Sequence, residues 1–406
     1  MKLVVAFALM MLWQSPSVAS VCPSFIWGFD LPGGFEGRIK DLKLFAKEGR
    51  YWSERSVQVD SIDESGHTQF FEDDSWQSTA LSRLDRISIA EEDFGRRLSL
   101  NEKRPCSSLV EVEREKRYAY LGFCKSDLPK HVSPKVRPNL AELEVATDRF
   151  RYRFSKENHL LFREFFVSSG QHELLVAHDA FLKIKADVKN FFTLKFDKTD
   201  VEANLEKYRA SPIALVGQLN FFLKILFFRI QVELKPEVMF FNRSAFVPMV
   251  MTMPVEGTAY LNHGSGLQYA WTFAPETILD RDLSKMPLWA RYVEYRDWRS
   301  LAKLGEQYCI GDDCFYRLVA KRGDRWATFD FKIPRTVVAR GFFPVLVAPT
   351  DPNSSLEKGE VGIFFESSGL AKGSYQWEFW LQVDAAPPRD YCPTAARVRS
   401  FLQGGR

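Results

Sequence analysis

The chain has 406 residues, a formal net charge of +3, 46% hydrophobic residues and 26% charged residues, which is an ordinary globular composition. A balance this close to neutral gives no global attraction to nucleic acid. The length allows a large buried core and favours two domains over one. The 35 phenylalanines supply much of the expected core.

The N-terminus is typical of a secretory signal peptide. Lys2 precedes an apolar run from Leu3 to Trp13, and small residues follow as far as Ser20. The run is too short for a hydrocarbon core, which needs about twenty residues. We therefore expect a cleaved leader and an exported protein, periplasmic or extracellular, with no transmembrane span after cleavage. Lipid attachment at Cys22 is the alternative.

Six cysteines in an exported chain predict disulfides, because oxidising compartments preserve them. Cys309 and Cys314 flank a short turn, and Cys106 and Cys124 flank an alternating stretch. If both local pairs form, Cys22 and Cys392 remain to join the two ends of the mature chain. No Cys-x-x-Cys motif points to redox or metal chemistry.

Prolines between residues 125 and 142 mark a boundary, because repeated prolines resist both helices and central strands. We divide the chain there. The expected parts are a signal peptide (1–20), an N-terminal β-rich domain (21–124), a Pro-rich linker (125–142) and a C-terminal β-rich α+β domain (143–406).

Most of the chain alternates between apolar and polar residues, as half-buried strands do. Phe150, Tyr152 and Phe154 alternate with arginines, and the apolar segment from Leu160 to Val167 then completes a hairpin. Further strands are predicted at residues 182–188, 225–234, 238–241, 245–253, 269–273, 326–333, 342–347, 361–365 and 375–383. The predicted fold is therefore a β-dominated α+β body of antiparallel sheets, stabilised by disulfides.

Two segments predict helices that pack on these sheets. In the segment from Asp200 to Ala210, Val201, Leu205 and Tyr208 have helical spacing, and Asp200 can cap the first turn. The segment from Thr394 to Leu402 is the second candidate.

No catalytic or cofactor motif is complete. His172 and His178 are six residues apart, so neither a helix nor a strand lets them share one ion, and we expect no metal. Ser265 lies in a glycine-flanked loop with His263, but the nucleophile motif Gly-x-Ser-x-Gly is not present. Asp280 and Asp282 lie near two tryptophans, which is the basis for an alternative function in glycan hydrolysis by paired carboxylates.

Basic side chains follow two strands. One side of the first strand carries Arg149, Arg151 and Arg153, and a second strand carries Lys183, Lys185 and Lys189. If both strands lie in one sheet, their cations line one face and bind phosphate or carboxylate groups of an envelope polymer or lipid. A simple solvated face is the competing interpretation.

The strand from Ala245 to Met253 is apolar on both faces and carries Met249 and Met251 on one of them. Methionine adapts to irregular apolar ligands, so this face is a candidate lining for an apolar groove. Burial beneath a helix explains the same pattern without a ligand.

We therefore expect an exported, non-catalytic binding protein without a cofactor, which recognises an anionic or an apolar component of the cell envelope. The alternatives are a secreted hydrolase acting on glycans and a structural protein of a surface assembly without a small ligand. No resemblance to a known family supports one of these over the others.

Overall fold

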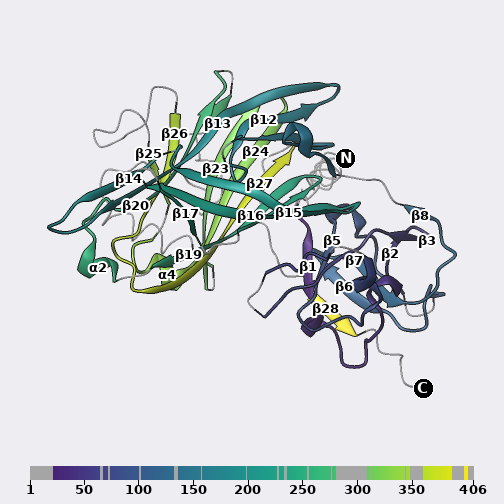
Figure 1. The fold of residues 1–406 in the computed structure, drawn as a ribbon. Coiled ribbons are helices and arrows are strands. Elements are labelled where there is room, and N and C mark those ends of the chain that lie inside the picture. The colour runs from purple at the N-terminus through teal and green to yellow at the C-terminus, as the bar shows by residue number, and fades with distance from the viewer. Residues whose placement is uncertain are drawn as a thin grey trace, which may run out of the picture.

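The structure is a computed structural model. It describes residues 22–64, 67–71, 74–99, 102–131, 136–156, 158–197, 199–225, 228–232, 236–253, 256–275, 277–279, 309–310, 312–342, 344–347, 360–385 and 397–400. Strands dominate, and the β-rich fold class expected from the sequence is confirmed. Figure 1 shows a smaller body, which contains the N-terminal part of the chain, beside a larger one built from two extended sheets.

The smaller body contains two sheets. The six-stranded sheet has the order β28-β6-β7-β2-β3-β8, and the three-stranded sheet has the order β1-β5-β4. The strands are β1 (Ser24–Trp27), β2 (Leu42–Glu48), β3 (Tyr51–Arg55), β4 (Gln58–Asp60), β5 (Arg86–Ile89), β6 (Val110–Arg114), β7 (Arg117–Phe123), β8 (Lys130–His131) and β28 (Arg397–Ser400). Short 3-10 turns lie at η1 (Gly28–Asp30), η2 (Ile39–Asp41), η3 (Asp74–Ser78) and η4 (Glu91–Asp93). Strands from both sheets contribute to one apolar core, which includes Ile26, Leu44, Ile87 and Val112.

One large sheet of the second body has nine strands in the order β25-β26-β20-β13-β12-β11-β10-β9, with β14 paired to β13. Its strands are β9 (Val136–Asn139), β10 (Glu144–Thr147), β11 (Phe150–Phe154), β12 (Phe162–Ser169), β13 (His172–Asp187), β14 (Thr193–Phe196), β20 (Gly266–Phe273), β25 (Pro344–Val347) and β26 (Glu360–Glu366). The 3-10 turn η5 (Leu140–Glu142) joins β9 to β10.

The other large sheet has ten strands in the order β15-β16-β18-β19-β27-β24-β23-β21, with β17 paired to β16 and β22 to β23. Its strands are β15 (Val201–Ala210), β16 (Ala214–Ile225), β17 (Phe228–Val232), β18 (Glu237–Phe241), β19 (Ser244–Met253), β21 (Ile278–Leu279), β22 (Cys309–Ile310), β23 (Asp313–Arg322), β24 (Arg325–Pro334) and β27 (Gly373–Asp384). The one-turn helices α2 (Gly257–Tyr260) and α4 (Arg335–Val338) lie beside these sheets.

The inward faces of the two large sheets form one apolar core. The alternation in β11 directs Phe150, Tyr152 and Phe154 into it, as the sequence predicts. Phe165 of the nine-stranded sheet meets Phe329 of the ten-stranded sheet with ring centroids 6.3 Å apart. The larger body is therefore a β-sandwich, and aromatic side chains from both sheets meet in its core.

The helix predicted from Asp200 to Ala210 is wrong. Those residues form β15, which pairs with β16 from Val201 opposite Leu223 to Ala210 opposite Leu215. The register shifts between Leu205 and Lys207, as at a β-bulge. The extra residue interrupts the alternation and leaves apolar residues at spacings that imitate a helix.

The helix predicted from Thr394 to Leu402 is also wrong over its described part, because residues 397–400 form β28 and pair with β6. A strand from the end of the chain therefore completes a sheet of the smaller body (Figure 1). This differs from the expected domain bounds, which place residues 143–406 together. The Pro-rich segment 125–142 contains β8 and β9, and Pro138 lies in the edge strand β9, where a missing N–H is tolerated.

The disulfide predicted between Cys106 and Cys124 is confirmed. Cys314 is also disulfide-bonded, and Cys309 lies opposite it in the β22–β23 ladder. Cys22 is disulfide-bonded as well, whereas Cys392 and the signal peptide lie outside the described residues. The pairing of Cys22 with Cys392 stays a prediction.

A third apolar cluster joins the two bodies. Phe25 of β1 packs against Phe246 and Trp380 on the outer face of the ten-stranded sheet, and Phe246 stacks on Trp380 with centroids 4.2 Å apart. Trp380 is fully buried. The contact between the two bodies is therefore formed by closely packed, buried apolar side chains, as in a protein core.

Candidate binding cavity

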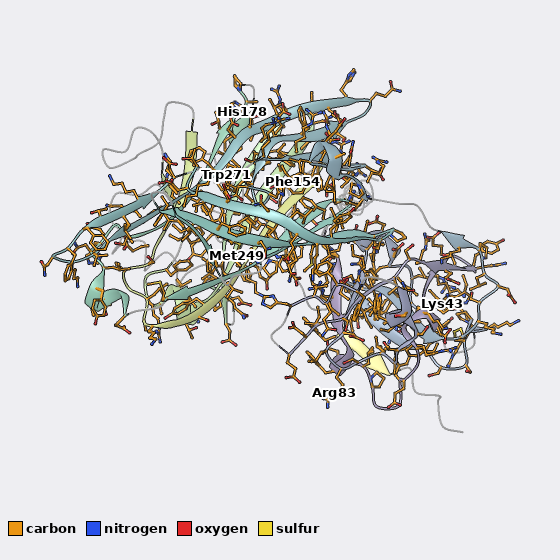
Figure 2. The ribbon with its side chains drawn as sticks, viewed as in Figure 1. Lys43, Arg83, Phe154, His178, Met249 and Trp271 are labelled. Carbon is orange, nitrogen blue, oxygen red and sulfur yellow. A yellow bond between two sulfur atoms is a disulfide. The ribbon has the colours of Figure 1, made fainter. Side chains whose placement is uncertain are left out.

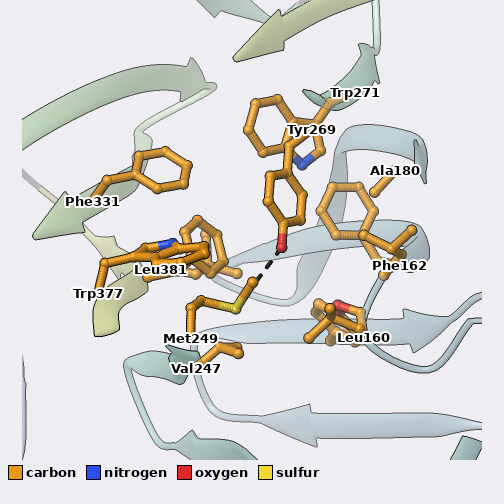
Figure 3. A pocket seen from close by; sticks show the side chains of 13 residues that line it. Leu160, Phe162, Ala180, Val247, Met249, Tyr269, Trp271, Phe331, Trp377 and Leu381 are labelled. Atoms are coloured by element: carbon orange, nitrogen blue, oxygen red, sulfur yellow. Dashed lines mark hydrogen bonds between the residues drawn. The ribbon is translucent and has the colours of Figure 1, made fainter. Parts of the chain in front are cut away.

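A cavity lies between the two sheets of the β-sandwich (Figure 3). Its volume is about 40 Å³, and the empty space that includes its opening to solvent is about 490 Å³. The nine-stranded sheet and its loops supply Tyr152, Leu160, Leu161, Phe162, Ala180, Tyr269 and Trp271, and the ten-stranded sheet supplies Val247, Met249, Phe331, Trp377, Phe379 and Leu381. The lining is almost entirely apolar, and apolar cavities of this kind stay dry and accept small apolar guests.

Two phenol groups add polar atoms to the wall. Tyr269 donates its hydroxyl to Met249 Sδ at 3.8 Å, as the dashed line in Figure 3 shows, and Tyr152 donates to the carbonyl oxygen of Leu160 at 3.0 Å. Burial raises the pKa of both tyrosines far above the ordinary value. Both phenols are therefore neutral donors at any physiological pH.

Trp377 supplies a third polar group. Its side chain lies along the wall of the cavity (Figure 3) and is 4% exposed, and its indole N–H has no hydrogen-bond partner among the described residues. A buried donor left unpaired costs about 1–3 kcal/mol. A guest that carries a hydrogen-bond acceptor removes this cost.

Met249 therefore lines a cavity, as the interpretation of its strand as part of an apolar groove requires. Met251 pairs with Tyr375 in the β19–β27 ladder, but its side chain is outside the described part of the structure. The aromatic wall, above all Trp377 and Tyr269, was missed from sequence. These residues come from strands more than a hundred positions apart in the chain, and their alternation indicates burial alone.

The predicted arginine face is largely neutralised. Arg151 forms ion pairs with Glu173 at 2.5 Å and Glu144 at 3.5 Å, and Arg153 pairs with Glu144 at 2.7 Å and Glu164 at 2.8 Å. Both guanidinium groups also lie over the Phe166 ring. These carboxylates occupy the positions that an external anion needs.

Arg149 and the lysines lie elsewhere. Arg149 precedes β11, and burial, followed by repulsion from Arg243 and Arg325, lowers its pKa. Lys183, Lys185 and Lys189 lie at or just beyond the far end of β13, in the same nine-stranded sheet as Arg151. The nine-stranded sheet thus contains both predicted basic segments, but Arg151 and Arg153 lie on β11 and the lysines at or just beyond the far end of β13.

The remaining candidates do not form a catalytic arrangement in the described part of the chain. Ser265 is fully buried, and its hydroxyl accepts the backbone N–H of Asp187 at 3.0 Å, while His263 meets Ser368 instead. His178 contacts Asp179, and no group of three described residues has the arrangement of a metal site. Asp280 and Asp282 lie outside the described residues. No helix in the described part is long and apolar enough to cross a membrane.

Comparisons with known proteins do not identify this chain. No family model and no curated protein matches it. An α-mannosidase from Enterococcus faecalis V583 is 8% identical and has a TM-score of 0.36 over 81% of this chain and 38% of its own. A protein of glycosyl hydrolase family 38 from Enterococcus faecalis is 9% identical and has a TM-score of 0.37 over 91% of this chain and 43% of its own. The chain spans about two fifths of the length of these structures, and similarity at this level assigns no function.

Proposed function

We propose that this protein is an exported binding protein that holds a small apolar molecule between the two sheets of its β-sandwich. The observation that carries the proposal is a cavity with an apolar lining, one wall of which is Trp377, a buried indole whose N–H is unpaired among the described residues. Ligand pockets typically combine apolar walls with a few well-placed polar groups. An apolar ligand is favoured over an anionic one because Arg151 and Arg153 already have carboxylate partners.

The dimensions and chemistry of the cavity restrict the ligand. A cavity that binds benzene measures about 150 Å³, so a ligand with one ring also occupies the opening of this smaller cavity, where the empty space totals about 490 Å³. Trp377 offers a donor, so the ligand carries an acceptor such as a carbonyl oxygen. Tyr269 holds only a weak thioether acceptor and is a second donor that can turn toward a guest.

The first experiment identifies the natural ligand. Mature protein is purified gently from its exported compartment, extracted into organic and aqueous phases and analysed by mass spectrometry beside a mock purification. The proposal predicts a stoichiometric apolar molecule in the organic phase. Protein with no such molecule, which also takes up no apolar probe, contradicts the proposal.

The second experiment uses acetophenone and ethylbenzene, which have similar size and differ in the carbonyl acceptor, in ligand-observed NMR titrations. Trp377→Phe should weaken acetophenone binding about two- to tenfold and leave ethylbenzene unchanged, because one hydrogen bond is lost. Met249→Trp should abolish the binding of both by filling the cavity.

The control for Met249→Trp is Val250→Trp. Val250 is the next residue of the same strand and is partly exposed, so its side chain points to the opposite face. Val250→Trp should bind both probes as the unchanged protein does. Equal losses in the two tryptophan variants would indicate general damage to β19.

A further inference from the structure

Large apolar side chains are exposed together at the end of the hairpin formed by β13 and β14. Phe191 is 80% exposed, Phe192 56%, Tyr260 53% and Leu194 36%. We call these four residues and the neighbouring Lys185, Lys189 and Lys195 the hairpin tip. In Figure 1 the β13–β14 hairpin and α2 lie at the end of the larger body remote from the smaller one. Exposed apolar groups gathered in this way mark contact sites.

The tip is held by an ordered backbone. Val188 donates its N–H to the Phe192 carbonyl at 2.8 Å, and Asn190 takes the left-handed conformation with φ +60°. The adjoining segment is attached as well, because Lys189 N–H donates to the Tyr260 carbonyl at 2.9 Å. The turn therefore presents Phe191 and Phe192 outward in a fixed arrangement, and they do not fold back onto the sandwich.

Lysines surround these apolar groups. Lys185 and Lys195 lie directly opposite each other in the β13–β14 ladder, where like charges repel. Neither ammonium group forms an ion pair with a described residue, and the Lys189 ammonium group donates to the Thr258 carbonyl. The nearest acid in the hairpin, Asp187, accepts the Thr193 hydroxyl at 2.9 Å. An external anion relieves the repulsion between Lys185 and Lys195.

We propose that the hairpin tip docks the protein on a lipid bilayer that carries anionic headgroups. Phe191 and Phe192 enter the boundary between headgroups and acyl chains, and the lysines meet lipid phosphates. A projecting tip offers little area for a protein partner, since a stable interface buries about 800 Å² on each side. Lysine is also depleted at protein interfaces, whereas aromatic and basic side chains together suit a membrane surface.

The test is co-sedimentation of the mature chain, without residues 1–20, with vesicles of phosphatidylcholine alone or with about one third phosphatidylglycerol. The proposal predicts binding to the anionic vesicles that weakens as salt is added. Phe191→Ser with Phe192→Ser should reduce this binding about tenfold or more, because the inserted apolar area is lost. Lys185→Gln with Lys195→Gln should also reduce it about tenfold.

Matched controls alter comparable groups on the smaller body. Tyr51→Ser removes an aromatic side chain that is 81% exposed, and Lys40→Gln with Lys116→Gln removes two exposed charges. Both control variants should bind anionic vesicles as the unchanged protein does. Met249→Trp should also bind them normally, since the proposal does not depend on the cavity.

Two outcomes overturn the proposal. The first is the absence of binding to anionic vesicles by the unchanged, folded protein. The second is binding that survives the loss of both phenylalanines while a soluble polyanion, dextran sulfate, competes for it and the lysine variant loses it. That result assigns the lysines to a soluble anionic polymer.

Discussion

Arg209 of the ten-stranded sheet donates a hydrogen bond to the buried carboxylate of Asp60 in the small three-stranded sheet. Arg86 donates to the other oxygen of Asp60 at 3.1 Å, and Glu237 accepts the Thr68 hydroxyl at 2.8 Å beside it. Apart from Arg209, which is partly buried, all these side chains are buried. A network of charges thus joins the two bodies next to the cluster of Phe25, Phe246 and Trp380.

Asp60→Asn should destabilise the protein by about 3–5 kcal/mol, because it leaves the arginine charges at the junction without their nearest counter-charge. The measurement is the free energy of unfolding in urea. Asp41→Asn is the matched control, since Asp41 pairs with Arg38 at an exposed position and should cost less than about 1 kcal/mol. Similar losses of unfolding free energy in both variants would show that the buried network at the junction contributes no more to stability than an exposed ion pair.

Trp380→Ala should cost about 3–5 kcal/mol, because it opens a cavity where Phe25 and Phe246 pack. The unchanged protein should unfold in a single transition when followed by fluorescence and by circular dichroism, since the two bodies share this core. Trp380→Ala should separate the two signals. A single transition that merely moves to lower urea would contradict coupling through this cluster.

Replacing Cys106 and Cys124 by alanine should lower the free energy of unfolding by about 3 kcal/mol, as expected for a bridge that closes a loop of this size. Urea unfolding of the double variant under non-reducing conditions gives the value. An unchanged free energy of unfolding would contradict this prediction. It would mean that the disulfide adds no restriction to the unfolded chain beyond that of the β6–β7 hairpin.

His159 should make stability depend on pH. Its Nδ1 accepts the Leu205 N–H at 2.9 Å, and burial lowers its pKa below the ordinary value of 6.5. Neutral His159 therefore stabilises the folded protein fully above the pKa that this histidine has in the unfolded chain. This stabilisation is lost as the pH falls through its lower pKa in the folded protein. Urea midpoints of the protein and of His159→Gln should differ most near pH 7.5 and converge as the pH falls toward 5. A difference that is constant over this range would contradict the assignment.

Individual strands were readable from the sequence where one face is buried. In β11, Phe150, Tyr152 and Phe154 alternate with arginines because a pleated strand turns successive side chains to opposite faces. The same reasoning failed for residues 201–210, because the bulge between Leu205 and Lys207 adds one residue that local periodicity does not reveal. It also failed for β28, whose hydrogen bonds come from β6, nearly three hundred residues earlier.

The candidate binding cavity likewise contains one residue that the sequence predicted and others that only the structure revealed. Met249 was a candidate from the sequence because its strand is apolar on both faces and methionine adapts to irregular apolar ligands. Trp377 and Tyr269 were not candidates, because their role depends on the position of the opposite sheet. The sequence places Arg151 and Arg153 on one face of their strand, but it does not show their carboxylate partners. Glu144 and Glu164 lie directly opposite Arg153 on the neighbouring strands, and Glu173 lies on β13.

The sequence by itself determined the predominance of strands and the short-range disulfide between Cys106 and Cys124. These follow from local alternation and from cysteine spacing, while export stays a prediction from the residues at the N-terminus. Tertiary structure alone decided which strands share a sheet, that a C-terminal strand completes the smaller body, and that Met249 and Trp377 line a cavity between the two large sheets. Such features arise from packing between distant segments, and no local pattern of residues encodes which distant segment a strand will meet.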